Sequence, residues 1–187
     1  MDASMKRINA VWGWLSIIAL LGHLATMSYS LLTGWYDFAI CKALAYATAI
    51  TVGGHVVFAL IVVMFLHDGA NLGGYAGLNK RTILQRVSGI AILVLLVAHV
   101  HSFGFITAGE PLDAPTKAFI IVTEVLFFAA ISGHLATSFS KSLITWGLIR
   151  EESTERRIDF ISEIVCAILF VVPSFALIRF VLFWMAG

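Results

Sequence analysis

Long apolar stretches alternate with short polar breaks along the whole chain, and this alternation predicts membrane-spanning helices. A helix needs about 20 apolar residues to cross the hydrocarbon core of a bilayer, and each stretch reaches that length. We therefore expect an all-α integral membrane protein, residues 1–187 forming one membrane domain, with five helices at about residues 10–32, 42–66, 83–106, 117–146 and 160–184.

The polar segments predict how these helices are connected. Residues 33–37 and 107–116 are typical of tight turns, residues 67–81 of a glycine-rich irregular loop, and residues 150–159 of a charged linker. The chain starts with a short basic segment, as a signal peptide does, but the first apolar stretch is too long for one, so we expect a retained span. Pro173 is expected to kink the last helix.

The composition favours a membrane protein over a soluble domain. The chain is 60% hydrophobic and 12% charged, and its mean hydropathy is +0.95. A net charge of +1 gives no reason to expect a nucleic-acid partner.

The basic residues are distributed unevenly between the two ends of the predicted helices. Cytoplasmic segments carry the excess of Lys and Arg, so the distribution predicts a cytoplasmic N-terminus and an external C-terminus. The residues on or near the predicted cytoplasmic side are Lys6, Arg7, Lys80, Arg81, Arg86, Lys141, Arg150, Arg156 and Arg157.

Four predicted helices each carry one histidine deep within apolar sequence: His23, His55, His99 and His134. At 1.5 Å per residue, His55 and His134 lie roughly 12 to 17 Å from the predicted cytoplasmic helix ends, and His23 and His99 roughly 20 to 24 Å. A hydrogen bond to a neighbouring helix explains any single one of them about as well as metal binding does. One histidine per helix at two shared depths favours metal ligation.

Pairing by depth predicts an inner site, His55 with His134, and an outer site, His23 with His99. Two axial histidines at each of two levels are what two stacked b-type haems in a helix bundle require. Glycines beside the histidines would let a flat porphyrin approach the backbone. The two cysteines form no C-x-x-C or C-x-x-C-H pattern, so any haem is expected to be held non-covalently.

Three motifs surround these histidines: Gln85-Arg-Val-Ser-Gly89 with His99 ten residues later, His134-Leu-Ala-Thr with Ile144-Thr-Trp-Gly147 after it, and His55-Val-Val-Phe-Ala-Leu. With them, the chain resembles the five-helix, di-haem cytochrome b subunit of succinate dehydrogenases and fumarate reductases, the single-anchor kind found with menaquinone. The resemblance spans nearly the whole chain. The first helix, with Gly22-His23-Leu-Ala-Thr, has the least distinctive sequence.

The resemblance implies haem ligation by the same two pairs and a cofactor set of two b haems with a quinone, menaquinone rather than ubiquinone, as substrate. It also implies a flavoprotein and an iron–sulfur subunit docked on the cytoplasmic side, in a prokaryotic cytoplasmic membrane. The chain would transfer electrons between that iron–sulfur subunit and the quinone, with no dicarboxylate chemistry of its own. Bis-histidine ligation suits electron transfer because it fills both axial positions of the iron.

Further candidates lie around the expected haems. Arg81 and Arg86 are candidates for propionate neutralisation, and they suit headgroup anchoring equally well. His101 lies roughly 200° around the helix from His99, so both cannot face one pocket. The family pattern selects His99 as the ligand and leaves His101 for a quinone or propionate contact. His67 is expected at the membrane interface, with a role in an inner quinone site left open.

Quinone turnover needs proton donors and acceptors beside an apolar slot. The candidates near the outer haem are His101, Glu124 and Asp37; for Glu124, a plain hydrogen bond to a neighbouring helix is the competing interpretation. Two other classes stay open for the whole chain. One is a di-haem anchor of another quinone-linked enzyme, of the hydrogenase or formate dehydrogenase type, and the other is a haem-free helical membrane protein.

Overall fold

The computed structural model of the chain describes residues 2–65 and 76–183. Within these residues there are five helices: α1 (Asp2–Thr33), α2 (Phe38–Phe65), α3 (Ala76–Ala108), α4 (Ala114–Thr145) and α5 (Glu152–Phe183). All five are long and apolar enough to cross a membrane. The predicted class, an all-helical chain with five potential membrane spans, is confirmed.

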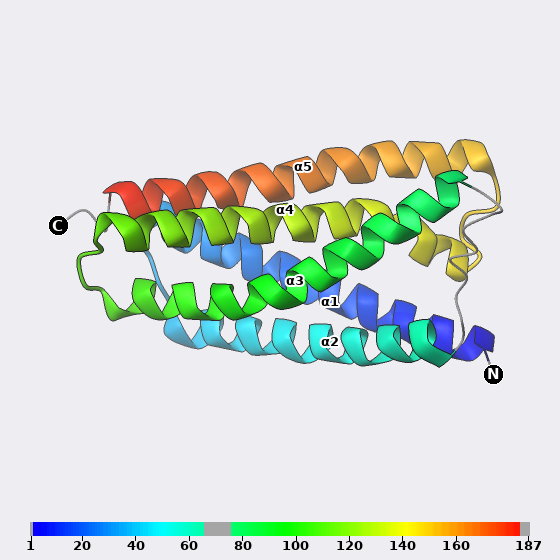
Figure 1. Cartoon of the computed structure of the whole chain (residues 1–187), viewed down its shortest axis with the longest axis horizontal. Coiled ribbons are helices and arrows are strands. Elements are labelled where there is room, and N and C mark those ends of the chain that lie inside the picture. The colour runs from blue at the N-terminus through cyan, green and yellow to red at the C-terminus, as the bar shows by residue number, and fades with distance from the viewer. Residues whose placement is uncertain (1, 66–75, 184–187) are drawn as a thin grey trace.

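The helices run side by side along the long axis of the molecule, each antiparallel to the one before it (Figure 1). We call the end that holds the start of α1 the inner end and the opposite end the outer end, as names for the two ends only. α1 and α2 form one hairpin and α3 and α4 form a second, with both hairpin turns at the outer end.

Helix packing is uneven across the bundle. The backbones approach closely between the two members of each hairpin, between α4 and α5, and between α1 and α5. In the part of the chain that the structure describes, α2 packs closely only against α1, and α3 only against α4. The main apolar core lies between α1, α4 and α5, and its buried residues are Leu24, Leu31, Ile120, Phe127, Phe128, Ile131, Ala176, Leu177 and Val181.

The two outer turns are built alike. Gly34 follows α1 with φ 74°, and Gly109 follows α3 with φ 71°. This left-handed conformation commonly ends a helix, and glycine adopts it without steric cost. The carboxylates of Asp37 and Asp113 then accept hydrogen bonds from backbone N–H groups three residues on, at 3.0 and 2.9 Å, and so cap α2 and α4.

Several helices begin earlier than the apolar stretches predict. α1 begins at Asp2, α3 at Ala76 and α5 at Glu152, where the predicted starts were about residues 10, 83 and 160. Hydropathy marks the part of a helix that lies in hydrocarbon, and backbone hydrogen bonding continues beyond it. The charged segment 150–159, predicted as a linker, is therefore mostly the first turns of α5, whose acidic Glu152 and Glu155 suit the positive end of the helix dipole.

Two prolines lie inside helices, and part of the predicted glycine-rich loop is helical. Pro115, placed in a turn by the sequence, lies in the first turn of α4, where its missing N–H costs no hydrogen bond. α5 continues through Pro173. The predicted loop at residues 67–81 is wrong from Ala76 onwards, where α3 has begun, and the remainder of the loop, with His67, lies outside the described residues.

Candidate functional site

The four histidines lie together as two pairs. The ring centroids of His23 and His99 are 6.3 Å apart, and those of His55 and His134 are 6.4 Å apart. We call His55 and His134 the inner pair, and His23 and His99 the outer pair. Each pair joins the two hairpins, because it takes one histidine from each. These are the pairs expected from depth, and their ligation of iron stays a prediction.

The ring separations can be compared with the geometry of a shared metal. Metal–imidazole bonds are about 2 Å long and a ring centre lies about 1 Å behind its nitrogen, so two axial imidazoles on one metal have centroids about 6 Å apart. Both pairs have this separation. The ring separation at each level therefore matches that of two imidazoles bound to one metal.

The inner pair is held by backbone carbonyl groups. Nδ1 of His55 lies 3.3 Å from the carbonyl oxygen of Asn9, and Nδ1 of His134 lies 3.0 Å from that of Gln85. The Ser88 hydroxyl is also 3.2 Å from Nδ1 of His134. When Nδ1–H donates to such a carbonyl, the lone pair is on Nε2, which is the arrangement that metal-binding histidines use.

A repeated sequence spacing underlies the similar backbone contacts of His55 and His134. Asn9 and Gln85 each lie four residues before a glycine, Gly13 or Gly89, whose added Cβ would touch the ring of His55 or His134 at 3.4 and 3.5 Å. In α1 and α3 alike, a histidine of the outer pair follows that glycine by ten residues. Our sequence reasoning missed this repeat, and the doubled Gly-x9-His spacing was the signal that would have found it.

The outer pair has different neighbours. Nδ1 of His99 lies 2.8 Å from Oε2 of Glu124, whose side chain is only 4% exposed. The Phe127 ring, one turn further along α4, packs against the His99 ring with centroids 4.8 Å apart. Nδ1 of His23 and Oε1 of Glu124 are buried and have no hydrogen-bond partner among the described residues.

The three quinone candidates do not lie together. Glu124 is buried against His99, His101 is exposed on the α3 surface beside the rings of Phe105 and Phe119, and Asp37 caps α2 at the outer turn. His99 and His101 have different neighbours, as their spacing in the sequence predicts. A role for any of the three in quinone binding stays a prediction.

Arg81 joins three helices near the inner end. Its guanidinium makes a two-point contact with Asp159 on α5, at 2.7 and 3.0 Å, and a longer one with Glu155 at 3.4 Å. It also donates to the Thr137 carbonyl and the Ser140 hydroxyl on α4. Arg81 therefore has a packing role, and its contact with a propionate stays a prediction, as does that of the half-buried Arg86.

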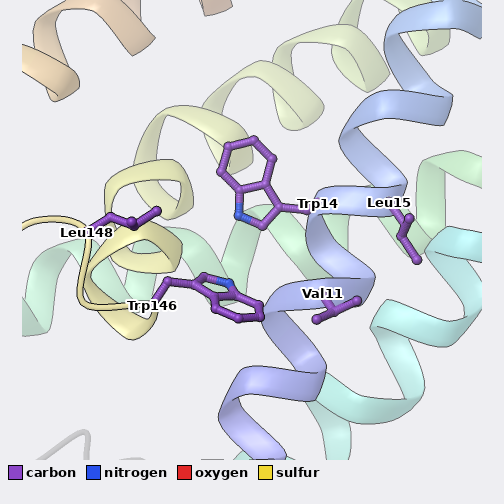
Figure 2. A pocket seen from close by; sticks show the side chains of 5 residues that line it. All are labelled: Val11, Trp14, Leu15, Trp146 and Leu148. Carbon is purple, nitrogen blue, oxygen red and sulfur yellow. The ribbon is translucent and has the colours of Figure 1, made fainter.

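An apolar pocket lies at the inner end, between α1 and the segment after α4 (Figure 2). It is lined by Val11, Trp14 and Leu15 on one side and by Trp146 and Leu148 on the other. No histidine and no charged side chain lines it. We therefore do not assign the electron-transfer chemistry to this pocket.

The donor sets suit a haem better than a bare metal ion. In the described segments, no group of three or more His, Cys, Asp or Glu side chains is arranged to hold a metal ion. A haem brings four nitrogen ligands of its own and needs only two axial donors from the protein. Two imidazoles at each level fit that requirement, and Gly13 and Gly89 lie against the rings of the inner pair.

No protein-family model, no curated protein and no solved structure matches this chain. Within the described residues, the fold and the site define a helical chain with five potential membrane spans and two histidine pairs that join two helix hairpins.

Proposed function

We propose that this chain is a membrane-anchor cytochrome b that holds one b haem between His55 and His134 and a second between His23 and His99. The observation that carries the proposal is the matched ring separation of 6.4 and 6.3 Å in two pairs formed by four different helices. The same separation recurs at two levels of one bundle, as two bound haems would require.

The chain's own residues support this role in two ways. The carbonyl groups of Asn9 and Gln85 accept from Nδ1–H of the inner histidines, so each Nε2 is available as a ligand. Between the two hairpins, the backbones approach only at α1 and α4 in the described part of the chain, and α2 and α3 stay apart. This separation suits a planar group between the hairpins. When bound, the haems would supply one-electron carriers with no open axial position.

We further propose that the chain anchors a succinate dehydrogenase or fumarate reductase and exchanges electrons with membrane quinone, menaquinone in particular. The support is the motif resemblance around His55, His99 and His134. A flavoprotein and an iron–sulfur subunit would dock at the inner end, which carries most of the basic residues and would face the cytoplasm of a prokaryotic cell. Dicarboxylate chemistry would belong to the flavoprotein.

A haem assay of the purified chain tests the first proposal. We expect a reduced-minus-oxidised spectrum of the b type and two haems extracted per chain. The matched control is His101→Ala, which removes an exposed histidine of α3 and should keep both haems. A purified chain that has no haem after expression with haem supplementation would refute the cytochrome and favour the haem-free class.

Affinity purification from native membranes tests the second proposal. Co-purification of a flavoprotein and an iron–sulfur protein with succinate-dependent reduction of a naphthoquinone is the expected result. Co-purification of a hydrogenase or formate dehydrogenase subunit would instead identify the other class of di-haem anchor. Comparison of naphthoquinone and benzoquinone turnover in the same preparation would identify the quinone type.

A further inference from the structure

Glu124 is a buried carboxylate whose hydrogen bond goes to an outer-pair histidine. Its Oε2 lies 2.8 Å from Nδ1 of His99, and its residue is 3% exposed. A carboxylate buried in apolar surroundings is costly unless a hydrogen bond or charge partner compensates it. Because Oε1 has no partner among the described residues, the bond to His99 is the compensation that the structure provides.

The surroundings of Glu124 restrict how His99 can turn. Phe127 packs against the His99 ring at 4.8 Å, three residues after Glu124 and on the same side of α4. A hydrogen bond at the ring edge and an aromatic contact thus both come from one rigid helix. Nδ1 of His99 faces Glu124, which leaves Nε2 as the ring nitrogen available to a metal.

The inner pair provides the internal comparison. Both of its Nδ1 atoms face neutral backbone carbonyls, those of Asn9 and Gln85. His99 faces a carboxylate instead, and its partner His23 has no hydrogen bond at Nδ1 within the described part of the chain. The two sites therefore have the same kind of ligand, and they differ in the charge placed behind one of those ligands.

We propose that Glu124 is the positioning residue of the outer pair: its carboxylate holds Nδ1–H of His99 so that Nε2 is presented to the outer haem iron, and it lowers the reduction potential of that haem. This inference rests on the proposed haem binding. A carboxylate behind a histidine ligand raises the basicity of that ligand. A more basic ligand and a nearby negative charge both stabilise the oxidised iron relative to the reduced iron, so the potential falls.

The test is an optical redox titration of the detergent-solubilised holoprotein, comparing wild type with Glu124→Gln and Glu124→Asp. Gln keeps the shape and an accepting oxygen but removes the charge. We expect Glu124→Gln to raise the reduction equilibrium constant of the outer haem at least tenfold, which is about 59 mV for a one-electron couple. Glu124→Asp should lie closer to wild type, and the inner haem should not change.

The outer haem is identified as the component that His23→Ala removes from the spectrum. The matched control is Ser174→Ala, which alters another buried polar side chain, on α5, that has no hydrogen-bond partner among the described residues. It should leave both potentials unchanged. Low-temperature electron paramagnetic resonance adds a second readout, because a changed hydrogen bond at His99 should move the g values of the outer haem alone.

Each outcome decides a different point. Unchanged outer potential in Glu124→Gln with both haems bound would overturn the inference and leave the cytochrome standing. Equal shifts of both haems, or loss of both, would also overturn it, because Glu124 would then act on the whole fold. Loss of the outer haem alone from Glu124→Gln, with retention in Glu124→Asp, would support it. Absence of haem from the wild type would refute the proposed function itself.

Discussion

The inner and outer histidine pairs have almost the same ring separation, 6.4 and 6.3 Å, but they differ in what lies behind the rings. Two backbone carbonyls hold the inner pair, whereas a carboxylate holds one ring of the outer pair. If the proposed function holds, the ring separation indicates where the two haems bind, and the hydrogen-bond partners of the rings indicate how the two haems differ. A sequence scan for histidines cannot make that second distinction.

The two hairpins that supply these pairs are also comparable. Asp113 lies 76 residues after Asp37, the same separation as between Gly13 and Gly89 and between His23 and His99, and both aspartates cap the helix after the outer turn. The hairpins differ in which helix packs against α5, namely α1 in the first hairpin and α4 in the second. α4 packs closely along α5, while α2 packs closely only against α1 in the described residues. Each of the following predictions tests one part of this comparison.

The largest expected effect is the loss of a haem from one pair without the other. His134→Ala should remove the inner haem and His99→Ala the outer one, so each variant should keep about half of the wild-type haem, because one axial ligand is missing. Haem extraction and quantification per chain measures this. The double variant should retain none, and a single variant that keeps both haems would contradict the assignment of its histidine.

The next effect concerns the glycine before each inner histidine. A Cβ on Gly54 would overlap the Trp12 ring, whereas a Cβ on Gly133 would meet nothing within 4 Å. Gly54→Ala should therefore destabilise the first hairpin by about 1 to 3 kcal/mol through overpacking. Gly133→Ala should be neutral or slightly stabilising, because alanine favours helix.

Thermal unfolding of the two glycine variants in one detergent measures the difference. Gly53→Ala is the control within α2, since its Cβ would also meet nothing within 4 Å. Equal unfolding midpoints for Gly54→Ala and Gly53→Ala would show that the Trp12 ring moves aside at no cost. The close approach of α1 and α2 at Gly54 would then not limit the stability of the first hairpin.

A smaller effect is expected where the second hairpin is tied to α5. Arg81→Ala removes charged hydrogen bonds to Asp159 and leaves that carboxylate, 27% exposed, without its guanidinium. We expect a loss of about 1 to 2 kcal/mol, because hydrogen bonds to charged groups contribute at that level and partial exposure reduces it.

Arg156→Ala is the matched control for Arg81→Ala. It breaks the Arg156–Glu152 pair, whose side chains are 75% and 78% exposed, and should cost a few tenths of a kcal/mol. Chemical unfolding followed by tryptophan fluorescence compares the two variants. A similar small loss in both would mean that the contact with Asp159 contributes no more than a surface ion pair.

The smallest expected effect is at the turn of the second hairpin. Hydrogen bonds from Thr116 hold the pKa of Asp113 below its usual value of 3.8. A carboxylate with a lowered pKa in the folded state stabilises it above the ordinary value, and this contribution is lost as the pH falls through the lowered pKa. Asp113→Ala should therefore lower the unfolding midpoint slightly at neutral pH, with the difference shrinking below about pH 4.

Asp113→Asn is the companion variant, because an amide oxygen can still accept the Thr116 N–H bond but does not ionise. It should keep more of the stability than Asp113→Ala and lose the pH dependence. A difference between wild type and Asp113→Ala that stays constant down to acidic pH would show that the cap does not depend on the charge.

Much of the fold could be predicted from the sequence because apolar stretches of about 20 residues form helices in a membrane almost without alternative. The number of potential spans follows from that rule. The starts of α1, α3 and α5 could not be predicted, because the polar turns before the apolar stretches continue the same hydrogen-bond ladder. Asp37 was interpreted as a quinone residue, and its contact with a backbone N–H shows a structural role that its outer position alone did not reveal.

The amino-acid sequence by itself determined that four histidines sit at two depths on four apolar helices, since depth along a helix is set by residue count alone. Only the tertiary structure decided which atoms lie behind those histidines. Whether a carbonyl, a carboxylate or nothing faces Nδ1 depends on how each helix is rotated about its axis and how close its neighbour packs. Both depend on contacts between residues that are far apart along the chain. Examples are the contact of Asn9 with His55 and that of Glu124 with His99.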